Sequence, residues 1–593
     1  MKGAKGLEDL SIEALSAAYR ERRMRPSQLI DALWPRIDAP DTGCVWISRV
    51  PRQSLMQRAR ELDSTDPASL PLYGVPFAIK DNIDLAGLAT TAACPASSYE
   101  PARSAHVVER LLAAGAIAVG KTNLDQFATG LVGTRSPFGA CHNAFAPGYI
   151  SGGSSSGSAV AVARGLVSFS LGTDTAGSGR VPAAFNNVVG LKPTLGRLST
   201  RGVVPACRTL DAVSIFALTA GDAAQVGRAA QGFDPEDPYS RRPPQGLPAA
   251  VAPGGGFRFG VPGPAELEFF GNSGYAQLFD QAIARLEALG GTRVPIGLSV
   301  FLEAGRLLYE GPWVAERYVV VETLLASRPD AMLPVTRGII EGARRFSAAD
   351  AFRAQYRLQA LRAAAAGIWQ DIDILLTPTA GTIYRIADIE ADPVRLNANL
   401  GYYTTFVNLL DLAAVAVPSG FDARGLPFGI TLTAPAWNDD RLLELAARYL
   451  REAQAIESTR SAEGVTLAVC GAHMQGLPLN GQLAGIGARF LERTVTAPRY
   501  RFYALPGGPP QRPGLVRVEQ GGASIEVELW CVPAASFGQF VAGIPRPLSI
   551  GKVELGGGGS VCGFLCETYA VAGARDITAL GGWRAWLARS DGL

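Results

Sequence analysis

The stretch from Ser151 to Arg180 constrains this chain more than any other, because two small, hydroxyl-rich turns there bracket an apolar run. The first turn, residues 152–157, reads GGSSSG, and the second, residues 172–179, reads GTDTAGSG. Glycine allows a tight backbone turn without a Cβ clash, so each turn can aim N–H groups and a serine hydroxyl at one point in space. A hydroxyl nucleophile beside converging N–H donors is the arrangement that acyl transfer requires.

The spacing of the two turns indicates how the chain folds between them. Ser154 and Ser178 are 178 − 154 = 24 positions apart, which suffices for one short helix and one strand that bring the chain back to its starting point. From Leu72 to about Ser199, strand-like apolar runs alternate with helical patterns. The sequence therefore predicts an α/β core, a mixed sheet covered by helices on both faces.

Two further segments frame this core. Residues 7–38 predict two amphipathic helices, with Ser11 as an N-cap and Pro26 at the break between them. Residues 239–257 are rich in proline, glycine and arginine, which is typical of a flexible surface crossing between two lobes.

A base for either serine is not obvious among the histidines, since the chain has only His106, His142 and His473. Lys80 is the alternative base, because it ends the apolar run GVPFAI at residues 74–79, which is typical of a buried strand. Burial lowers the pKa of a lysine toward the range in which it can accept a proton. The competing interpretation is a surface lysine, which is the usual place of this residue.

The first turn also allows a different catalytic interpretation. Residues 153–157, GSSSG, spell the G-x-S-x-G elbow of α/β-hydrolases, with Ser155 as the nucleophile. Such an enzyme needs a histidine after its nucleophile, and the candidate His473 lies beyond a predicted domain boundary. We regard the elbow match as coincidental.

The two turns and the lysine strand together resemble the amidase signature family, over roughly the first 450 residues. The resemblance implies that Ser178 is the nucleophile, that Ser154 is a bridging serine behind a cis peptide bond, and that Lys80 is the base. It implies that Asp174 and Arg180 brace the second turn. The oxyanion hole would be formed by the N–H groups of Thr175, Ala176, Gly177 and Ser178.

Composition excludes several other classes of protein. The net charge is +2 with the basic residues dispersed, so there is no electrostatic footprint for nucleic acid. No signal-peptide pattern and no run of about 20 apolar residues occurs, which predicts a cytoplasmic protein without a membrane partner. The eight cysteines lack paired metal-ligand spacing, so we expect free thiols and no metal site. Hydrolysis by two serines and a lysine needs no organic cofactor either.

The segment LYEGPWVAERY at residues 308–318 is a candidate substrate-binding element. On one helix Tyr309 and Arg317 would be about two turns apart and share a face. The planar fork of arginine suits a carboxylate, and a phenol adds an oriented hydrogen bond. The alternative is an ordinary helix with a solvated arginine.

This segment, the second turn and a C-terminal extension resemble the allophanate hydrolases within the amidase family. That resemblance implies that Tyr309 and Arg317 hold the terminal carboxylate of the substrate and that Gly130 adds backbone contacts. It implies hydrolysis of allophanate, or urea-1-carboxylate, to ammonia and carbon dioxide. A homodimer, and functional coupling to a biotin-dependent urea carboxylase, are also implied.

A polar stretch near residues 455–465 predicts a boundary between an amidase domain at 1–460 and a second domain at 466–593. The second domain is rich in glycine and short β-prone runs, which predicts a small, mainly-β, barrel-like α+β domain. Only residues 577–587, with Trp583 and Trp586, have a helical pattern.

The second domain resembles the γ-glutamyl-cyclotransferase-like domain of allophanate hydrolases. The resemblance implies that His473 assists decarboxylation of the first product, N-carboxycarbamate. Glu567 is a weaker candidate for an acid/base partner. A histidine that is merely hydrogen-bonded at a strand end, and a domain that serves assembly, are the alternatives.

Other functions remain open at this stage. The chain could be another small-amide hydrolase, or an amidase component of the kind that acts on charged tRNA, although no basic RNA-facing tract is present. It could also be a non-catalytic assembly scaffold, against which the intact Lys80, Ser154 and Ser178 argue. The sequence leaves open whether the pathway starts from urea, biuret or triazines.

Overall fold

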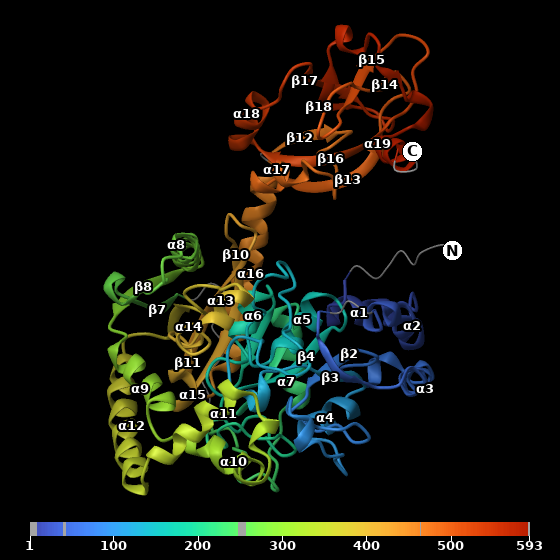
Figure 1. Cartoon of the computed structure of the whole chain (residues 1–593). Helices are drawn as coiled ribbons and strands as arrows, with labels where there is room; N and C mark the ends of the chain where they lie inside the picture. Colours follow the sequence, from blue (N-terminus) through green and yellow to red (C-terminus); the bar gives the residue numbers. More distant parts are fainter. Residues whose placement is uncertain (1–8, 40–42, 247–255, 463, 591–593) are drawn as a thin grey trace. The chain divides into compact units, whose positions relative to one another are not determined.

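The computed structural model describes residues 9–39, 43–246, 256–462 and 464–590. The chain divides into two compact units, Met1–Glu452 and Ala453–Leu593 (Figure 1). The predicted surface crossing at residues 239–257 falls partly outside the described residues, since 247–255 are not among them. Within the described ranges, no helix is both long enough and apolar enough to span a membrane.

In the described part of the first unit, eleven strands form one mixed sheet with the order β1-β3-β2-β4-β6-β5-β10-β11-β9-β7-β8. Strand β2 pairs in parallel with β3 and β4, whereas β4 pairs antiparallel with β6. The predicted mixed sheet with helices is confirmed. The strands are β1 Trp46–Arg49, β2 Pro76–Lys80, β3 Ile117–Thr122, β4 Phe169–Asp174, β5 Val189–Lys192, β6 Ala212–Ala217, β7 Phe257–Pro262, β8 Gly291–Ile296, β9 Ile374–Pro378, β10 Leu412–Phe421 and β11 Pro427–Pro435.

The helices of this unit surround the sheet (Figure 1). The two predicted N-terminal helices are confirmed as α1 and α2, and Ser11 Oγ accepts the Ala14 N–H at 3.3 Å as the N-cap of α1. The helices are α1 Ile12–Arg20, α2 Pro26–Ile37, α3 Arg52–Asp63, α4 His106–Ala113, α5 Ser156–Ala163, α6 Val181–Phe185, α7 Ala220–Ala230, α8 Ser273–Ala288, α9 Ser299–Tyr309, α10 Val314–Ser327, α11 Pro334–Glu341, α12 Ala348–Ile368, α13 Ile386–Ala391, α14 Arg395–Leu400, α15 Phe406–Leu409 and α16 Asp439–Ala462, the last of which continues past the end of this unit at Glu452.

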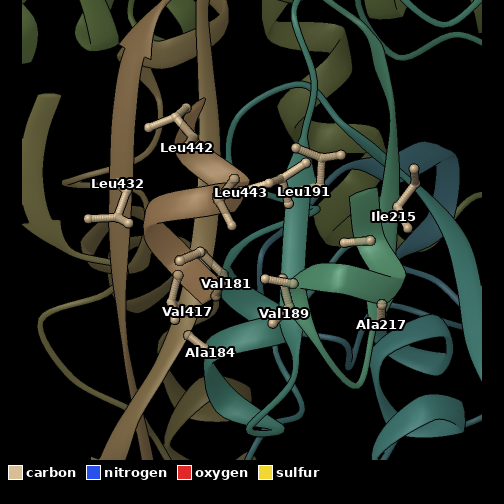
Figure 2. Close-up of a cluster of buried hydrophobic side chains, with 14 of the residues drawn as sticks. Val181, Ala184, Val189, Leu191, Ile215, Ala217, Val417, Leu432, Leu442 and Leu443 are labelled. Carbon is tan, nitrogen blue, oxygen red and sulfur yellow. The ribbon is translucent and has the colours of Figure 1, made fainter. Parts of the chain in front are cut away.

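The apolar core anchors the segment that follows Ser178. Helix α6 buries Val181 and Ala184 in a cluster with Val189 of β5, Val417 of β10 and Leu432 of β11 (Figure 2). Full burial of a valine or leucine side chain contributes about 1.5–3 kcal/mol. The second turn therefore lies between strand β4 and a helix that is packed on the middle of the sheet.

The second unit contains two sheets in its described residues, with the strand orders β13-β16-β12-β18-β17 and β15-β14-β19. The predicted β-rich domain is confirmed. The strands are β12 Gly464–Val469, β13 Arg489–Val495, β14 Tyr500–Ala504, β15 Pro513–Arg517, β16 Glu526–Pro533, β17 Leu548–Glu554, β18 Ser560–Cys566 and β19 Arg575–Asp576. The helices are α17 Asn480–Gly485, α18 Ala534–Ala542 and α19 Trp583–Ser590.

The helical prediction for the second unit is wrong in two respects. Helices α17 and α18 also form, although their short, glycine-containing sequences carry little helical periodicity. The predicted helix at residues 577–587 begins only at Trp583, because Gly581 takes a left-handed conformation with φ +70° that ends the preceding turn.

Candidate active site

Lys80 is the last residue of β2 and is completely buried. Its Nζ donates to Ser154 Oγ at 2.8 Å and to Thr173 Oγ1, on the neighbouring strand β4, at 2.8 Å. Burial lowers the pKa of Lys80 to about 7, although the carboxylates of Asp125 and Asp211 oppose the shift. The predicted buried strand is confirmed, and the surface-lysine alternative is wrong.

Ser154 lies in the first turn, two residues before the start of α5, and the Gly153–Ser154 peptide bond is cis. The Asp125 N–H donates to Ser154 O at 3.1 Å. A Cβ on Gly153 would lie 2.1 Å from Asp125 Oδ2, so only glycine permits this close approach. The Asp125 carboxylate in turn accepts three backbone N–H groups of the loop at residues 132–135.

Asp125 is a site residue that the sequence analysis missed. Its position in the sequence could have marked it, because it follows the buried strand β3 by three residues. Strand β3 is the neighbour in the sheet of β2, the strand that ends at Lys80. The Asp125 side chain holds the first turn and the loop at residues 132–135 together.

The second turn is braced from inside by an ion pair. Asp174 Oδ1 accepts the Gly177 N–H and Arg180 Nη2, while Oδ2 accepts the Gly179 N–H and Arg180 Nε, each at 2.9 Å. All of these groups are buried, so the Arg180 guanidinium and two backbone N–H groups compensate the charge of Asp174. The bracing role predicted for Asp174 and Arg180 is confirmed.

The same turn is also held from outside. Thr404 Oγ1 donates to Ala176 O at 2.7 Å, and Thr175 Oγ1 donates to Asp211 Oδ1 at 2.5 Å. Gly177 has φ +133°, and a Cβ there would lie 2.4 Å from Thr404 Oγ1. The sequence analysis missed Thr404 and Asp211, which no motif marks.

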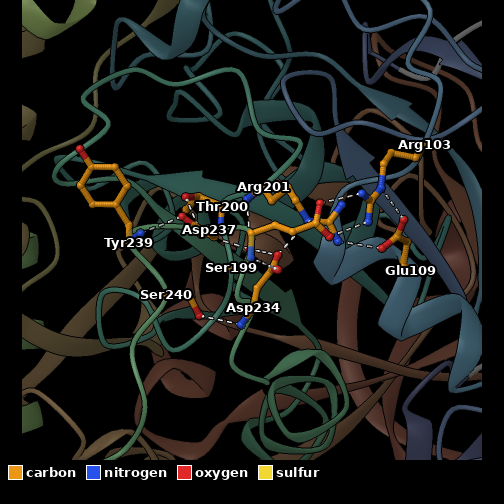
Figure 3. A network of polar contacts seen from close by, with 10 residues as sticks. Arg103, Glu109, Ser199, Thr200, Arg201, Asp234, Asp237, Tyr239 and Ser240 are labelled. Atoms are coloured by element: carbon orange, nitrogen blue, oxygen red, sulfur yellow. Dashed lines mark hydrogen bonds and ion pairs between the residues drawn. The ribbon is translucent and has the colours of Figure 1, made fainter.

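A network of largely buried polar contacts fixes the segment at residues 199–201, which precedes Asp211 in the chain (Figure 3). Arg201 pairs with Glu109 at 2.9 Å and with Asp234 at 2.8 Å, and Asp237 accepts the Thr200 N–H at 2.7 Å. These contacts tie residues 199–201 to helix α4 and to the loop that follows α7.

The groups that remain unpaired in the second turn are those that could meet a substrate. Within the ranges given above, Ser178 Oγ and the N–H groups of Ala176 and Ser178 make no hydrogen bond. Ser178 is 3% exposed. The structure thus joins Lys80 to Ser154 and leaves the Ser178 hydroxyl available, while the Gly177 N–H is occupied by Asp174.

The expectation that Tyr309 and Arg317 lie on one helix is wrong. Tyr309 ends α9 and Arg317 lies in the first turn of α10, because the Gly311-Pro312 pair interrupts the helix. The solvated-arginine alternative is also wrong, since Arg317 is 3% exposed. Burial raises the pKa of the Tyr309 phenol, and the nearby Arg317 guanidinium opposes that shift.

Gly130 lies in the loop that holds Arg317. Arg317 Nη1 donates to Ala128 O at 3.1 Å and to Thr129 Oγ1 at 3.0 Å. A Cβ on Gly130 would lie 2.6 Å from Asp125 Oδ2. Asp125 therefore lies against both the loop of Gly130, which holds Arg317, and the turn of Ser154. It connects these two segments.

His473 belongs to the second unit, in the loop between β12 and α17. Its Nε2 lies 3.0 Å from Gln482 Oε1, and its ring stacks on Phe564 with a centroid separation of 5.1 Å. Burial lowers the pKa of His473. His473 lines a cavity of about 670 Å³, whereas Glu567 is exposed and does not line it.

Among the described residues, no group of three or more histidine, cysteine, aspartate or glutamate side chains is arranged to hold a metal ion.

Comparisons with known proteins identify the family of the chain. A family model described as "Amidase" matches residues 28–443, and the chain therefore belongs to the amidase family. A second family model, described as "Allophanate hydrolase C-terminal domain", matches residues 465–588. The two matches divide the chain in nearly the same place as its two compact units.

Individual relatives refine this assignment. Urea amidolyase of Saccharomyces cerevisiae is 43% identical across 94% of this chain. The match covers 32% of that protein, so this chain spans about a third of the length of the urea amidolyases that it matches. A solved structure of Kluyveromyces lactis allophanate hydrolase is 42% identical, with 98% of this chain and 99% of that chain covered and a TM-score of 0.71. A solved structure of peptide amidase from Stenotrophomonas maltophilia is 28% identical, with 75% and 97% covered and a TM-score of 0.65.

Proposed function

We propose that the chain is an allophanate hydrolase, an amidohydrolase that converts allophanate to ammonia and carbon dioxide. The observation that carries the proposal is the 2.8 Å contact of a fully buried Lys80 Nζ with Ser154 Oγ, beside a turn that presents Ser178. Similarity to the Kluyveromyces lactis allophanate hydrolase over nearly the whole of both chains supports the choice of substrate.

In the first step, neutral Lys80 takes a proton from Ser154 as Ser154 takes the proton of Ser178. Ser178 Oγ then attacks the carbonyl of allophanate that bears the terminal amide nitrogen. The relay returns the proton to this leaving nitrogen, the C–N bond of the tetrahedral intermediate breaks, and ammonia departs to leave the acyl-enzyme. No metal or organic cofactor takes part in these steps.

The tetrahedral intermediate carries its negative charge on the former carbonyl oxygen. We assign its stabilisation to the N–H groups of residues 175–178, with those of Ala176 and Ser178 unoccupied in the resting enzyme. The Gly177 N–H donates to Asp174, so it would have to share that bond with the oxyanion. Removal of one oxyanion donor typically costs on the order of 10²–10³ in rate.

Water then cleaves the acyl-enzyme to N-carboxycarbamate, ⁻OOC–NH–COO⁻, and frees Ser178. Loss of carbon dioxide leaves carbamate, which breaks down to a second ammonia and a second carbon dioxide. We assign assistance of the decarboxylation to His473.

Recognition of the substrate carboxylate is assigned to Tyr309 and Arg317, with backbone contacts from Gly130. The Arg317 guanidinium is anchored through Nη1 on the loop at residues 127–129, which fixes the plane of its fork. A fixed planar fork selects a carboxylate over a neutral amide.

We further propose domain boundaries at 1–460 and 466–593, with a γ-glutamyl-cyclotransferase-like fold for the second domain. We also propose a homodimer, a cytoplasmic location and functional coupling to a biotin-dependent urea carboxylase. Two observations on the urea amidolyases support the coupling. Their name refers to urea, and about two thirds of their length lies outside the part that this chain matches.

The proposal is tested by ammonia release from allophanate, malonamate, biuret and glutamine. We expect the highest kcat/KM for allophanate. A preference for glutamine would instead favour an amidase of the kind that acts on charged tRNA, and a preference for biuret would favour another small-amide hydrolase. Absence of ammonia from all four substrates would favour a scaffold.

A further inference from the structure

The segment at residues 206–211, which we call the bridge segment, lies between the two parts of the proposed active site. It leads directly into strand β6, which pairs antiparallel with β4 and sets Ala212 opposite Asp174. Antiparallel strands keep successive residues opposite one another, so Asp211 faces Thr175, the first residue of the second turn beyond β4. The register of the sheet therefore places the end of the bridge segment against the second turn.

Asp211 holds this end of the bridge segment to the second turn. Its Oδ1 accepts the Thr175 hydroxyl at 2.5 Å and the Cys207 N–H at 3.1 Å. Its Oδ2 accepts the Ala206 N–H at 2.7 Å. Hydrogen bonds to a carboxylate are stronger than those between neutral groups, and Asp211 is buried. One side chain thus joins the second turn to two backbone groups of the bridge segment.

Asn408 provides a second link between the same two segments. Its Nδ2 donates to Leu210 O and to Asp174 O, each at 2.8 Å. Within the bridge segment, Cys207 O accepts the Leu210 N–H at 2.8 Å and the Asp211 N–H at 2.9 Å. The bridge segment is therefore a closed turn that is fixed to the second turn at two points.

The bridge segment also holds the start of helix α10, which carries Arg317. Thr209 donates to Glu316 twice, from its N–H to Oε2 at 2.9 Å and from its Oγ1 to Oε1 at 2.5 Å. Cys207 Sγ donates to Trp313 O at 3.6 Å. Trp313 is the N-cap of α10 and Glu316 directly precedes Arg317, so these contacts fix the first turn of the helix.

Arg317 itself contacts the bridge segment. Burial raises the pKa of the Cys207 thiol to about 12, and the charge of Arg317 and its hydrogen bond to the thiol oppose that shift. The guanidinium is thus held both by Cys207 and by the loop at residues 127–129. A single segment therefore contacts both the second turn and the residue that is assigned to the substrate carboxylate.

We propose that the bridge segment fixes the distance between Ser178 and the Arg317 guanidinium and thereby selects the length of the substrate, with Asp211 and Glu316 as its positioning residues. The proposal rests on the proposed function, since it presupposes an amide substrate with a carboxylate. In allophanate and in malonamate one atom separates the scissile carbonyl from the carboxylate carbon, whereas in succinamate two atoms separate them. A misplacement of about 1 Å can cost about 10²-fold in rate, so a fixed distance discriminates against the longer anion.

The test compares kcat/KM for malonamate and succinamate in the full chain. We expect a preference for malonamate of about 10²-fold. Glu316→Ala removes both bonds to Thr209 and should reduce this preference at least about tenfold, mainly through a higher KM for malonamate. Thr209→Val removes only the hydroxyl and keeps the charge of Glu316. It should reduce the preference by a smaller factor, which separates positioning of Arg317 from the electrostatic effect of the carboxylate.

Glu322→Ala, at an exposed position of the same helix, is the matched control and should keep the preference. Propionamide, a neutral amide, should be hydrolysed by Glu316→Ala as by the unchanged chain, which a misfolded variant could not do. Asp211→Asn acts on the second turn, so it should lower kcat for malonamate and propionamide alike. An unchanged preference for malonamate in Glu316→Ala or Thr209→Val, or an unchanged kcat in Asp211→Asn, would overturn the proposal.

A second measurement does not depend on turnover. Malonamate should protect Ser178 from a fluorophosphonate at a lower concentration than succinamate, and Glu316→Ala should remove the difference. If the unchanged chain releases no ammonia from allophanate but shows this difference, the length selection stands and the hydrolase assignment is lost. If it hydrolyses allophanate but Glu316→Ala keeps the preference for malonamate, the hydrolase assignment stands and the length selection is lost. A chain that neither releases ammonia nor is labelled overturns both, because both require a reactive Ser178.

Discussion

Lys80 Nζ lies 2.8 Å from Ser154 Oγ, although the two residues are separated by 74 positions in the chain. Strand β2 delivers the lysine and the first turn delivers the serine, and both groups are completely buried. Because the pair is shielded from bulk solvent, the proton of the proposed reaction passes directly between the two side chains.

The first prediction identifies the nucleophile. Ser178→Ala should abolish both ammonia release and covalent labelling by a fluorophosphonate, whereas Ser154→Ala should leave a slow residual activity. Ser155 Oγ donates to Thr173 O at 3.1 Å, so Ser155→Ala should disturb packing and leave labelling intact. If Ser155→Ala abolished ammonia release and Ser178→Ala did not, the result would favour the α/β-hydrolase elbow with Ser155 as the nucleophile.

The second prediction concerns the base and pH. Since the pKa of Lys80 is lowered to about 7, kcat/KM should fall by about tenfold per pH unit below that value, as the ammonium replaces the neutral amine. Lys80→Met should be nearly as severe as Ser178→Ala, because members of one proton relay act as a unit. A pH profile that stays flat from about pH 5.5 to 8 would contradict the assignment.

The same shift predicts a pH dependence of stability. In the unfolded chain Lys80 keeps its proton up to the ordinary pKa of 10.5, whereas in the folded chain it loses the proton above about 7. The unfolded state therefore binds more protons between these values, and the contribution of Lys80 to folding stability rises with pH across this window. Lys80→Met should remove this rise, and thermal melting at several pH values measures it.

The third prediction tests the carboxylate fork. Arg317→Lys should raise KM for allophanate sharply, because an ammonium point charge cannot replace a fixed planar fork. Uncharged amides should be affected much less, which steady-state kinetics on both kinds of substrate will show. Equal losses on charged and neutral amides would make Arg317 a structural residue.

The fourth prediction tests the geometry of the second turn. Gly177→Ala should cost about 1–3 kcal/mol of stability and most of kcat, because the new Cβ meets Thr404 Oγ1 and the φ angle disfavours alanine. Thr404→Val, which removes the bond to Ala176 O, should cost about 1 kcal/mol. Gly338→Ala is the control, since its Cβ would meet nothing within 4 Å. Chemical denaturation and kcat of the three variants check this order.

The fifth prediction separates the two units. If His473 assists decarboxylation, His473→Ala should leave release of the first ammonia intact and let N-carboxycarbamate accumulate, which ¹³C NMR detects as delayed carbon dioxide release. If the second unit serves assembly, His473→Ala should be silent, and removal of residues 466–593 should instead change sedimentation.

The sequence by itself determined those features of this protein that depend on interactions between residues close together in the chain. The GGSSSG and GTDTAGSG turns, the apolar run that ends at Lys80, and the brace of Asp174 by Arg180 are each contained within a few consecutive residues. Continuous apolar runs bounded by turn residues predict buried strands without knowledge of their partners. The mixed sheet and the β-rich second unit followed from such patterns.

Only the tertiary structure revealed the contacts that join distant segments. Thr404 reaches the second turn across 228 positions, and Arg317 reaches Ala128 across 189. Neither contact produces a periodic pattern in the sequence. A single side-chain hydrogen bond restricts the residue type at one position, but it does not require other residues at a regular spacing. Tyr309 and Arg317 also illustrate what local sequence does not determine. Their spacing predicted one helix, but the Gly311-Pro312 pair separates α9 from α10. Tertiary packing determines that Arg317 is buried against the loop at residues 127–129.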